Sequence, residues 1–502
     1  MTRLQYFYII IGVCLAGHGF AATPDSTRVE RASWWHGLAE AGRQNPAFMA
    51  DAFRYSRSEL SLHTDYKHQN QPLVLQEGKG HFLPQAAVST YLKMSGRSAV
   101  WGEASYMNGQ QNDQLWNSTA DYALLAPYVL ADSVGGNIRR ERYILTGGYG
   151  THIKKWMMGG ELRLRAEQAY RTVDPRMRGV ITDLTLKMGT AYNTQNYRWG
   201  MAVWANIYKQ ANDVDIYNEL GGAAEYVMLG LGNYNRRFSG SNTDIYVKGG
   251  ATGTLLSLHP LQGSGFFADL LLSSLRHQRI SDSHNYLPLT MLYTTRASIT
   301  AGWKHDACRR YALYATLSTQ RKHGDEYIAG DAVGGIYPTL AQLTMYKHHH
   351  TEAYLTALYG GSRPSVWNVK AVIGFQGDSE RYVYPERKQT VKHLFGSLQG
   401  QSFFAPTERL TVEGHLKAAY YASLQSAILM PYAEMKPSII SLVDHNYAQL
   451  RASYTWIETH WRADYQPLRS RYALFMALGV AAAFNNVANN HLHLQLTAGV
   501  TF

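Results

Sequence analysis

The sequence contains little cysteine: its 502 residues include only Cys14 and Cys308. Cys14 lies in an N-terminal apolar stretch that we expect to be removed as part of a secretory signal. Only Cys308 would then remain in the mature protein. The sequence therefore excludes an intramolecular disulfide and a metal site built from several cysteines.

Long apolar runs are also absent beyond the N-terminus. No later stretch reaches the roughly 18 consecutive apolar residues that a membrane-spanning helix needs, so helical spans are excluded. A chain of 502 residues usually divides into several domains, yet no linker rich in Pro, Ser or Gly and no change of composition divides this one. One large β-barrel explains these absences better than several globular domains.

Catalytic motifs are missing as well. We find no Walker loop, zincin helix, Cys-X-X-Cys, nucleophile elbow or dinucleotide fingerprint, and we expect neither enzymatic activity nor a cofactor. The triplet Gly377-Asp378-Ser379 resembles the start of a lipase signature, but no Asp/His block follows it. We expect this triplet to lie in a loop after a strand. An outer-membrane hydrolase is therefore the least favoured function.

The N-terminus has the pattern of a signal peptide. Arg3 precedes the apolar stretch Tyr6–Leu15, and small residues before Ala21 and Ala22 suit cleavage after either alanine. We expect residues 1–22 to be removed. The formal net charge would then fall from +11 to +10, because Arg3 is lost with no acidic residue.

The last residues of the chain alternate strictly in polarity. From His491 to Phe502, Leu492, Leu494 and Leu496 share one parity with Ala498, Val500 and Phe502, and polar residues or glycine fill the other. A strand with this pattern has one apolar and one polar face, and about ten residues cross a bilayer as a tilted strand. The stretch looks like the closing strand of an outer-membrane barrel, whose terminal aromatic, here Phe502, is read by the barrel-assembly machinery.

From Ser58 onward, amphipathic strands alternate with short turns and longer polar loops. We predict an all-β fold, a transmembrane antiparallel β-barrel of about 18 strands (range 14–18) formed by residues 58–502. The predicted strands are 59–68, 87–94, 99–107, 143–152, 156–171, 181–193, 197–209, 244–257, 266–280, 290–304, 310–321, 341–359, 366–376, 389–403, 410–421, 447–456, 471–484 and 491–502. The predicted short turns lie near Ser95, Lys154, Gln195, Gln262, Ala307, Gly361 and Pro406.

Residues 23–57 differ from the rest of the chain. Their large apolar residues recur at helical spacing, and Asn45 followed by Pro46 is a typical helix start. We expect a short helical N-terminal segment, which is either a plug in the barrel or a periplasmic cap. Its triplet Asn45-Pro46-Ala47 resembles the start of fatty-acid-transporter-type barrels.

Charged residues lie on the polar faces of several predicted strands. We take eight of them as lumen-lining candidates: Glu161, Arg163, Arg165, Glu167, Arg296, Lys304, Glu413 and Lys417. Such a ladder sets solute preference in an open pore. It could equally form a salt-bridged interior that stabilises a filled barrel.

Two further groups of residues suggest binding. In the run Lys347–Glu352, strand parity places His348, His350 and Glu352 on the polar face, where they could bind a divalent metal with a ligand from another strand. Basic residues in or beside predicted external loops could contact lipopolysaccharide or attract anionic solutes: Arg139, Arg140, Arg142, Arg176 and Arg178. They form no continuous patch on a recognisable nucleic-acid-binding fold, so we expect no nucleic acid partner.

Taken together, residues 58–502 resemble the uncharacterised outer-membrane β-barrel proteins of Bacteroidetes-type Gram-negative bacteria. The resemblance rests on the signal peptide, the Tyr- and Gly-rich strands and Phe502. It implies an outer-membrane location and a porin-like channel or transporter for nutrients or small solutes. The alternative is a non-transporting structural or assembly partner of a TonB-dependent uptake receptor complex, which would dock through the apolar stretch 424–445. The chain itself shows no TonB box.

Overall fold

The structure, a computed structural model, describes residues 25–38, 43–219, 224–240, 244–362, 366–487 and 489–502. The predicted signal peptide, residues 1–22, lies outside the described residues.

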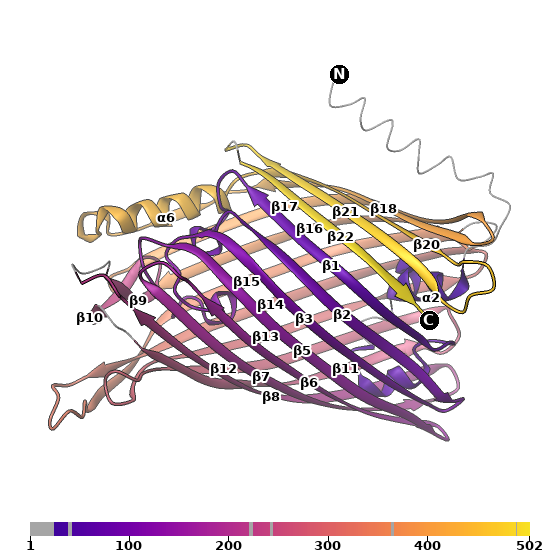
Figure 1. Ribbon diagram of the computed structural model, residues 1–502, viewed down its shortest axis with the longest axis horizontal. Helices are drawn as coiled ribbons and strands as arrows, with labels where there is room; N and C mark the ends of the chain where they lie inside the picture. Colours follow the sequence, from indigo (N-terminus) through magenta and orange to yellow (C-terminus); the bar gives the residue numbers. More distant parts are fainter. Residues whose placement is uncertain (1–24, 39–42, 220–223, 241–243, 363–365, 488) are drawn as a thin grey trace.

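Within the described residues, 18 antiparallel strands pair in chain order, and β1 also pairs with β22, so the sheet closes into a barrel (Figure 1). The predicted fold and strand number are confirmed. The barrel strands are β1 (Arg57–Gln69), β2 (Gly80–Ser95), β3 (Ser98–Gln114), β5 (Gly136–Ile153), β6 (Trp156–Tyr170), β7 (Arg176–Asn193), β8 (Tyr197–Asp215), β11 (Ile245–Pro260), β12 (Gly265–Ser281), β13 (Leu287–Asp306), β14 (Arg309–Ala329), β15 (Thr339–Gly361), β16 (Val366–Tyr382), β17 (Arg387–Thr407), β18 (Leu410–Ser423), β20 (Tyr454–Tyr465), β21 (Ala473–Asn485) and β22 (Asn490–Thr501).

The barrel closes where its first and last strands meet. Leu60 of β1 lies opposite Val500 of β22, and Leu62 lies opposite Ala498, so the apolar faces of the two strands coincide. The backbone N–H of Phe502 donates to the Ser58 carbonyl at 3.0 Å, and the Ser58 N–H donates to the Phe502 carbonyl at 2.7 Å. The alternating C-terminal stretch is therefore the closing strand.

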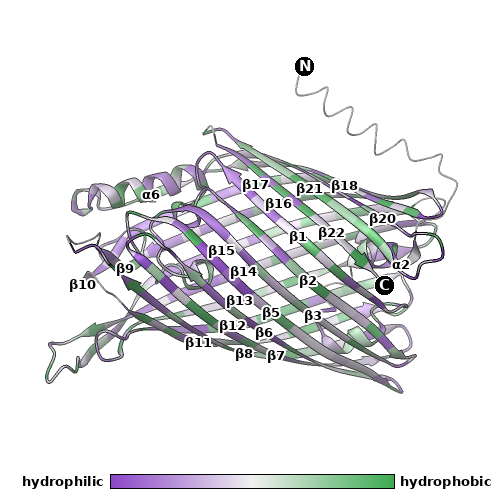
Figure 2. Cartoon of the chain, viewed as in Figure 1, coloured by the Kyte–Doolittle hydropathy of each residue, from purple (hydrophilic) through white to green (hydrophobic). Residues whose placement is uncertain are grey.

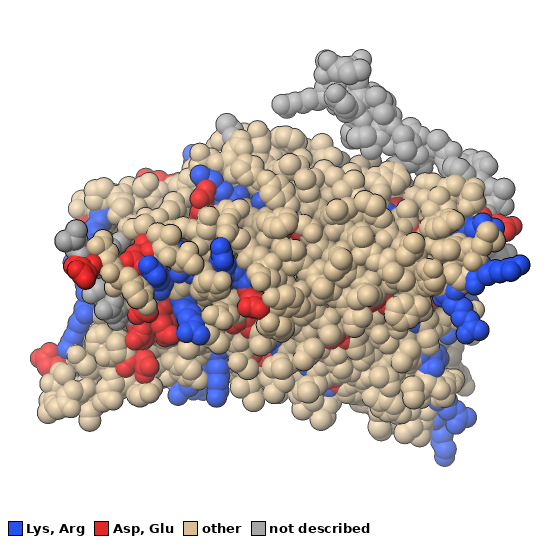
Figure 3. Space-filling view, viewed as in Figure 1, with Lys and Arg blue, Asp and Glu red and all other residues tan. Residues whose placement is uncertain are grey.

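The outer wall of the barrel is apolar. On β8, for example, Trp199 and Ile207 point outward and are 56% and 60% exposed. Tyr208, which points to the other face of the strand, is buried inside the barrel. Hydrophobic and hydrophilic residues alternate along the strands in Figure 2. On the face shown in Figure 3, charged side chains gather towards the two ends of the barrel, with few between them. This is the surface expected of a barrel surrounded by lipid. No helix among the described residues is long and apolar enough to cross a membrane.

The two ends of the barrel differ in their connections. At one end, which we call the turn end, the predicted short turns are confirmed, as in Ile153–Trp156 and Thr407–Leu410. At the other, the loop end, four connections carry their own structure among the described residues. These elements are η2 (Leu75–Glu77), α5 (Tyr122–Leu125), β4 (Leu130–Ala131), β9 (Glu225–Gly230), β10 (Asn233–Gly240), β19 (Ala427–Leu429), η3 (Tyr432–Glu434) and α6 (Pro437–Leu450).

One predicted strand is partly wrong. Residues 447–450 form the last turn of α6, and β20 begins only at Tyr454 and then continues to Tyr465. The connections that follow the predicted strands 99–107 and 197–209 are shorter than expected, because β3 continues to Gln114 and β8 to Asp215. The ends of these two strands carry polar residues on both faces. The alternation of apolar and polar residues, from which the strands were predicted, therefore ends before the strands do.

The N-terminal residues 25–38 and 43–56, which we call the inner segment, run along the inside of the barrel. They form α2 (Ser26–Ala32), α3 (Trp34–Gly37) and η1 (Pro46–Asp51). η1 contacts the wall formed by β3, β5, β6, β7 and β8 near the turn end. Side chains and backbone of α2 and α3 contact β16, β17 and β18, as detailed below.

A second group of residues fills the barrel at the loop end. Residues 115–135 and 225–240, which we call the cap, include a small sheet of β4, β9 and β10. Their apolar side chains form one buried cluster with inward residues of the barrel wall and with α6. The main buried members are Trp116, Leu125, Tyr128, Leu130, Val227, Phe238, Ile181, Tyr208, Val247, Leu292, Tyr346, Ile439 and Leu442. The largest apolar core of the protein therefore lies inside the barrel, at one end.

Candidate functional site

The inner segment is tied to the barrel wall by a cluster of charges. Arg28 on α2 forms an ion pair with Glu413 of β18, and its Nε lies 3.9 Å from Oδ2 of Asp464. The Arg462 guanidinium lies 2.9 Å from Asp464 and 3.0 Å from Glu59. Glu413, a predicted lumen-lining residue, therefore faces the interior, where it holds the inner segment.

Helix α3 is anchored by hydrogen bonds to the same wall. The Trp34 backbone N–H donates to Oε1 of Gln401 at 3.0 Å, and the Asn368 amide donates to Ser33 Oγ at 3.3 Å. The Trp35 indole is buried in a small apolar cluster with Ala312 and Leu358. Neither Gln401 nor Asn368 was singled out from the sequence, although both lie on the polar parity of their strands.

The start of η1 is buried against the opposite wall. Asn45 caps the helix: its Oδ1 accepts from the Ala47 backbone N–H at 2.9 Å. Its amide also donates to the Thr190 carbonyl at 3.1 Å, and the Asn45 side chain is fully buried. The predicted helix start is therefore correct, and the same residue attaches the segment to β7.

Four glycines on four neighbouring strands let the wall approach η1 closely. A Cβ atom at Gly200 would lie 2.7 Å from the Phe48 ring, and one at Gly159 would collide with the Pro46 backbone. Real Cβ atoms essentially never approach this closely. We call these glycines the glycine seat; they are Gly150, Gly159, Gly189 and Gly200. Because the four glycines lie on separate strands, no sequence motif reveals that they form one site.

The cap is held by a buried ion pair. Arg171, just after β6, donates to Oδ2 of Asp132 at 2.6 Å, and both side chains are fully buried. Ser118 Oγ donates to the same oxygen at 2.7 Å and lies 3.2 Å from Oε1 of Glu225 on β9. The two chain segments of the cap thus meet at one polar centre.

Glu225 makes the cap sensitive to pH. Burial and then the nearby Asp132 carboxylate raise the pKa of Glu225 to about 8. A carboxyl group whose pKa rises on folding binds its proton more tightly in the docked state. Its favourable contribution is complete below the ordinary pKa of about 4.5 and is lost as pH rises through about 8.

We expect hydrogen exchange of residues 115–135 to accelerate between pH 5.5 and pH 8.5, after correction for the intrinsic rate. The opening equilibrium should change by up to about tenfold per pH unit. Glu225→Gln should flatten this dependence, because the amide cannot ionise. An equally steep dependence in Glu225→Gln would contradict the assignment.

The charged ladder continues from the cap into the wall. Arg165 lies 2.6 Å from Asp121 of the cap and 3.3 Å from Glu167. The Glu167 carboxylate is fully buried and also pairs with Arg140 and Arg142, each at 2.8 Å. This part of the ladder is a salt-bridged interior. Arg140, which we placed at the end of a predicted external loop, belongs to β5, as does the neighbouring Arg142.

The other lumen-lining candidates also have interior positions. Glu161 accepts from the Trp101 indole at 2.9 Å and lies 3.3 Å from Lys187. Arg163 lines a cavity of about 480 Å³ beside the inner segment. Of the remaining three, Arg296 donates to Gln320 at 2.7 Å, Lys304 is half-buried on β13, and Lys417 lines the chamber described next.

Helix α6 packs over the loop end of the barrel. Ile439 and Leu442 are buried in the cap core, and Asn446 accepts from the Leu75 backbone N–H at 3.0 Å. The Gln449 side chain accepts from Asn485 at 3.0 Å and from Asn489 at 3.2 Å. The apolar stretch 424–445 is therefore only in part a free surface, because Ile439, Leu442 and Val443 are buried in the cap core. Leu424, Leu429 and Tyr432 are exposed, and docking of a partner through this stretch stays a prediction.

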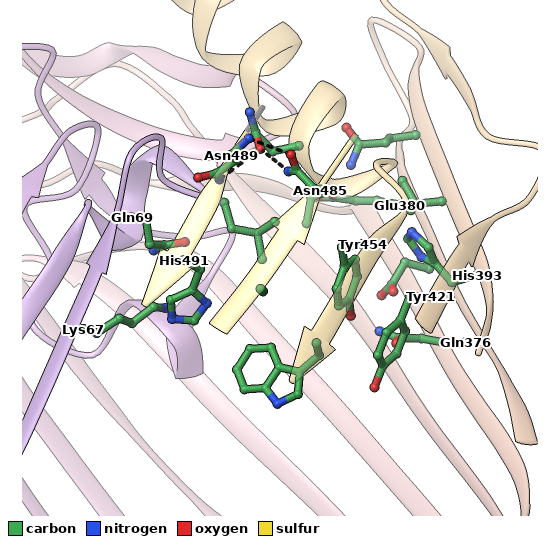
Figure 4. Close-up of a pocket in the computed structure, with 18 of the residues that line it drawn as sticks. Lys67, Gln69, Gln376, Glu380, His393, Tyr421, Tyr454, Asn485, Asn489 and His491 are labelled. Atoms are coloured by element: carbon green, nitrogen blue, oxygen red, sulfur yellow. Dashed lines mark hydrogen bonds between the residues drawn. The ribbon is translucent and has the colours of Figure 1, made fainter. Parts of the chain in front are cut away.

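Beneath α6 lies a chamber of about 640 Å³. Figure 4 shows Lys67, Gln69 and His491 on one side of it and residues of β16, β17, β18 and β20 on the other. The Tyr421 and Tyr454 rings stack there with centroids 4.3 Å apart. Amides, imidazoles, carboxylates and ammonium groups share the lining with these aromatic faces. Such a lining suits a polar organic molecule that also has an apolar face.

Of the two predicted metal-binding histidines, His348 lines this chamber. His348 Nε2 lies 3.2 Å and His350 Nδ1 lies 2.9 Å from Oδ1 of Asp378 on β16. The third predicted ligand, Glu352, instead lies opposite Gln376 in the strand register. The structure therefore adds Asp378 to the pair, and metal binding by His348, His350 and Glu352 stays a prediction.

The lipase-like triplet is part of the barrel wall, where Ser379 lies opposite His349 of β15. Gly377, Asp378 and Ser379 lie within β16, so their predicted position in a loop is wrong. Asp378 faces the interior with His350, and Ser379, the next residue, points to the opposite face of the sheet. Ser379 therefore has no partner among the described interior histidines.

The fold and its filled interior define a large antiparallel barrel of the outer-membrane type. Residues 46–502 match DUF6850, a family of unknown function, and the chain belongs to this family. No curated protein matches the sequence.

Solved structures with similar architecture are distant. The ferric preacinetobactin receptor BauA from Acinetobacter baumannii has a TM-score of 0.43 and 8% identity, over 89% of this chain and 80% of that one. The copper transporter OprC has a TM-score of 0.43 and 10% identity, over 86% of this chain and 62% of that one. The siderophore receptor PiuA from Acinetobacter baumannii has a TM-score of 0.38 and 6% identity, over 88% and 82%. Likeness at this level carries no information on substrate.

Proposed function

We propose that this protein spans the outer membrane of a Gram-negative bacterium and carries a small polar solute through its barrel. The inner segment acts as a plug near the turn end, which faces the periplasm, and the cap acts as a second closure near the loop end. The observation that carries the proposal is the chamber of about 640 Å³ beneath α6. Its volume and mixed lining are those of small-molecule sites.

The contacts of the inner segment are those expected of a plug that can be released from the barrel wall. Most are ion pairs and hydrogen bonds, such as Arg28 with Glu413 and Asn45 with the Thr190 carbonyl. The polar wall that remains after release can be hydrated at modest cost. Release would expose the buried Phe48 and Trp35 and the partly buried apolar residues of the segment, which are Trp34, Leu38, Met49 and Phe53.

The expected surroundings of the barrel follow from its surface. The apolar outer wall contacts outer-membrane lipid, and Arg178 with other basic residues near the loop end contacts lipopolysaccharide. Phe502, which is 63% exposed at the turn end, is available to the barrel-assembly machinery.

A TonB-dependent uptake receptor complex is a further proposed partner. A Bacteroidetes-type host and similarity to fatty-acid transporters also remain predictions.

A reversible lock on the inner segment tests the transport function. Gly150 has the most room of the four glycines in the seat, because an added Cβ atom would lie 3.1 Å from its nearest neighbours, one of which is the Ala50 backbone nitrogen. Gly150→Cys with Ala50→Cys therefore brings two thiols close enough to test for a disulfide. The exposed Cys308 is replaced by serine. A strain without the gene is compared with its parent for growth on a panel of single nutrient sources.

We expect the reduced double-cysteine variant to restore growth on the affected source. Oxidation should abolish this restoration, and a reductant should return it. Each single-cysteine variant serves as the control and should be insensitive to oxidation. Full restoration by the oxidised, locked variant would contradict transport past the inner segment and would favour a structural partner of another complex.

A further inference from the structure

Three side chains converge inside the barrel at its closure. Asp65 on β1, His81 on β2 and His493 on β22 each offer one ligand atom, and these atoms all lie within 4.8 Å of one another. The Asp65 Oδ1 atom lies 2.6 Å from His81 Nε2 and 2.8 Å from His493 Nε2. Among the described residues, no other three His, Cys, Asp or Glu side chains meet this criterion.

The strand register holds these side chains together. Lys67 lies opposite both His81 and His493, so the two histidines flank β1 at the same level, and Asp65 is the next inward residue of β1. Each of the three is 21–24% exposed, so the site is reached from the lumen but largely enclosed. All three come from different strands of a closed sheet, which fixes their separation.

The donor set is that of a transition-metal site. Imidazole nitrogen and carboxylate oxygen bind zinc-class divalent ions at about 2.0–2.2 Å, and two histidines with one carboxylate leave a position open for water or another ligand. Tetrahedral ligands at this distance are about 3.4 Å apart. Small side-chain rotations from the present hydrogen bonds reach that geometry.

The surroundings of the three residues support the same assignment. The Gln495 amide donates to Asp65 Oδ2 at 3.2 Å and thereby orients the carboxylate, as outer partners of metal ligands do. The His491 ring stacks on His493 with centroids 6.3 Å apart, and its buried Nε2 has no hydrogen-bond partner among the described residues. Lys67 is unfavourable for cation binding, because its ammonium group adds a positive charge beside the site.

We propose that Asp65, His81 and His493 bind one divalent transition-metal ion of the zinc class. The ion joins β1, β2 and β22 across the seam where the barrel closes. Its open position faces the lumen beside Lys67, Gln69 and His491, which line the chamber. This site does not depend on the transport function.

The test uses the full chain purified in detergent, stripped of metal with a chelator. Zn²⁺ binding is measured by calorimetry, and Co²⁺ is used as a coloured probe of coordination. We expect one equivalent of Zn²⁺ per chain and a Co²⁺ absorption band typical of a low-coordinate site. Asp65→Asn and His493→Gln should each weaken Zn²⁺ binding by more than about tenfold and remove the band.

The chain supplies a matched control in His63, another residue of β1, whose ring lies 2.8 Å from Thr497 and outside the cluster. His63→Gln should leave Zn²⁺ binding unchanged. His350→Gln, which removes an imidazole from Asp378, tests the competing pair His348 and His350. Lys67→Gln should tighten binding, because it removes the nearby positive charge and no ligand. Each variant is first shown to keep the compact, heat-modifiable migration of a folded barrel, and His81→Gln replaces any ligand variant that fails this check.

Three results would overturn the proposal. They are the absence of stoichiometric Zn²⁺ binding by the full chain, unchanged binding in the folded ligand variants, and loss of binding in His350→Gln alone. The last result would assign the metal to the pair His348 and His350 instead. None of these measurements requires transport, so the site can fail while the transport function stands.

Discussion

Gly159→Val is expected to expel η1 from its place on the barrel wall. A Cβ atom at this position would meet the Pro46 carbonyl group and the Ala47 nitrogen, which are backbone atoms and cannot rotate aside. Displacing η1 exposes Phe48 and breaks the buried hydrogen bonds of Asn45. We expect the free energy of docking to fall by about 3 kcal/mol or more, from lost apolar burial and unsatisfied polar groups.

The measurement is limited proteolysis of the folded barrel in detergent, with cleavage mapped by mass spectrometry. Residues 45–56 should become cleavable in Gly159→Val. The matched control is Gly160→Val, because this adjacent residue points to the opposite face. Its Cβ atom would lie 3.9 Å from the Lys187 carbonyl oxygen, its nearest heavy atom outside the neighbouring residues. Equal resistance of both variants would show that the glycine seat does not hold the inner segment.

Asp132→Ala is expected to release the cap. The substitution leaves the Arg171 guanidinium buried without its carboxylate, and it also removes the acceptor of Ser118 Oγ and of the Gly135 backbone N–H. Breaking a buried ion pair by removing one partner costs about 3–5 kcal/mol. Hydrogen exchange should therefore accelerate in residues 115–135 and 225–240 while the barrel strands stay protected.

Arg176→Ala is the matched control for the cap. Arg176 lies near Arg171 but is 45% exposed, and it pairs at 2.8 Å with Asp174 at the surface. Surface ion pairs contribute about 0–1 kcal/mol, so cap exchange should change little. If Asp132→Ala and Arg176→Ala had the same small effect, the buried polar centre would not be what holds the cap.

The barrel could be predicted from the sequence because its strands need one apolar and one polar face. Lipid outside and polar groups inside impose this alternation, and Leu492 to Phe502 follow it without interruption. The error at Tyr447 arose where this rule does not act. In α6, the residues Ile439, Leu442, Val443 and Tyr447 repeat at helical spacing and are buried, the first three of them in the cap core, so the helix continues to Leu450.

The interior could be predicted only in part. Strand parity placed Glu413 and Glu167 on the inward face, where the structure has them. It could not identify their partners, which are Arg28 for Glu413 and Arg140, Arg142 and Arg165 for Glu167. Those pairings depend on the register between strands and on the path of the inner segment. The glycine seat and the convergence of Asp65, His81 and His493 are invisible in the sequence for the same reason, since their members come from different strands.

Single-channel conductance in planar bilayers tests the central claim, that two chain segments close the lumen in series. The full chain is compared with a variant lacking residues 25–54, a variant in which residues 117–133 are replaced by a short Gly/Ser linker, and a variant with both changes. We expect the full chain to be nearly silent, each single variant to conduct weakly or intermittently, and the double variant to conduct steadily. Steady conductance of the full chain at the level of the double variant would contradict the account.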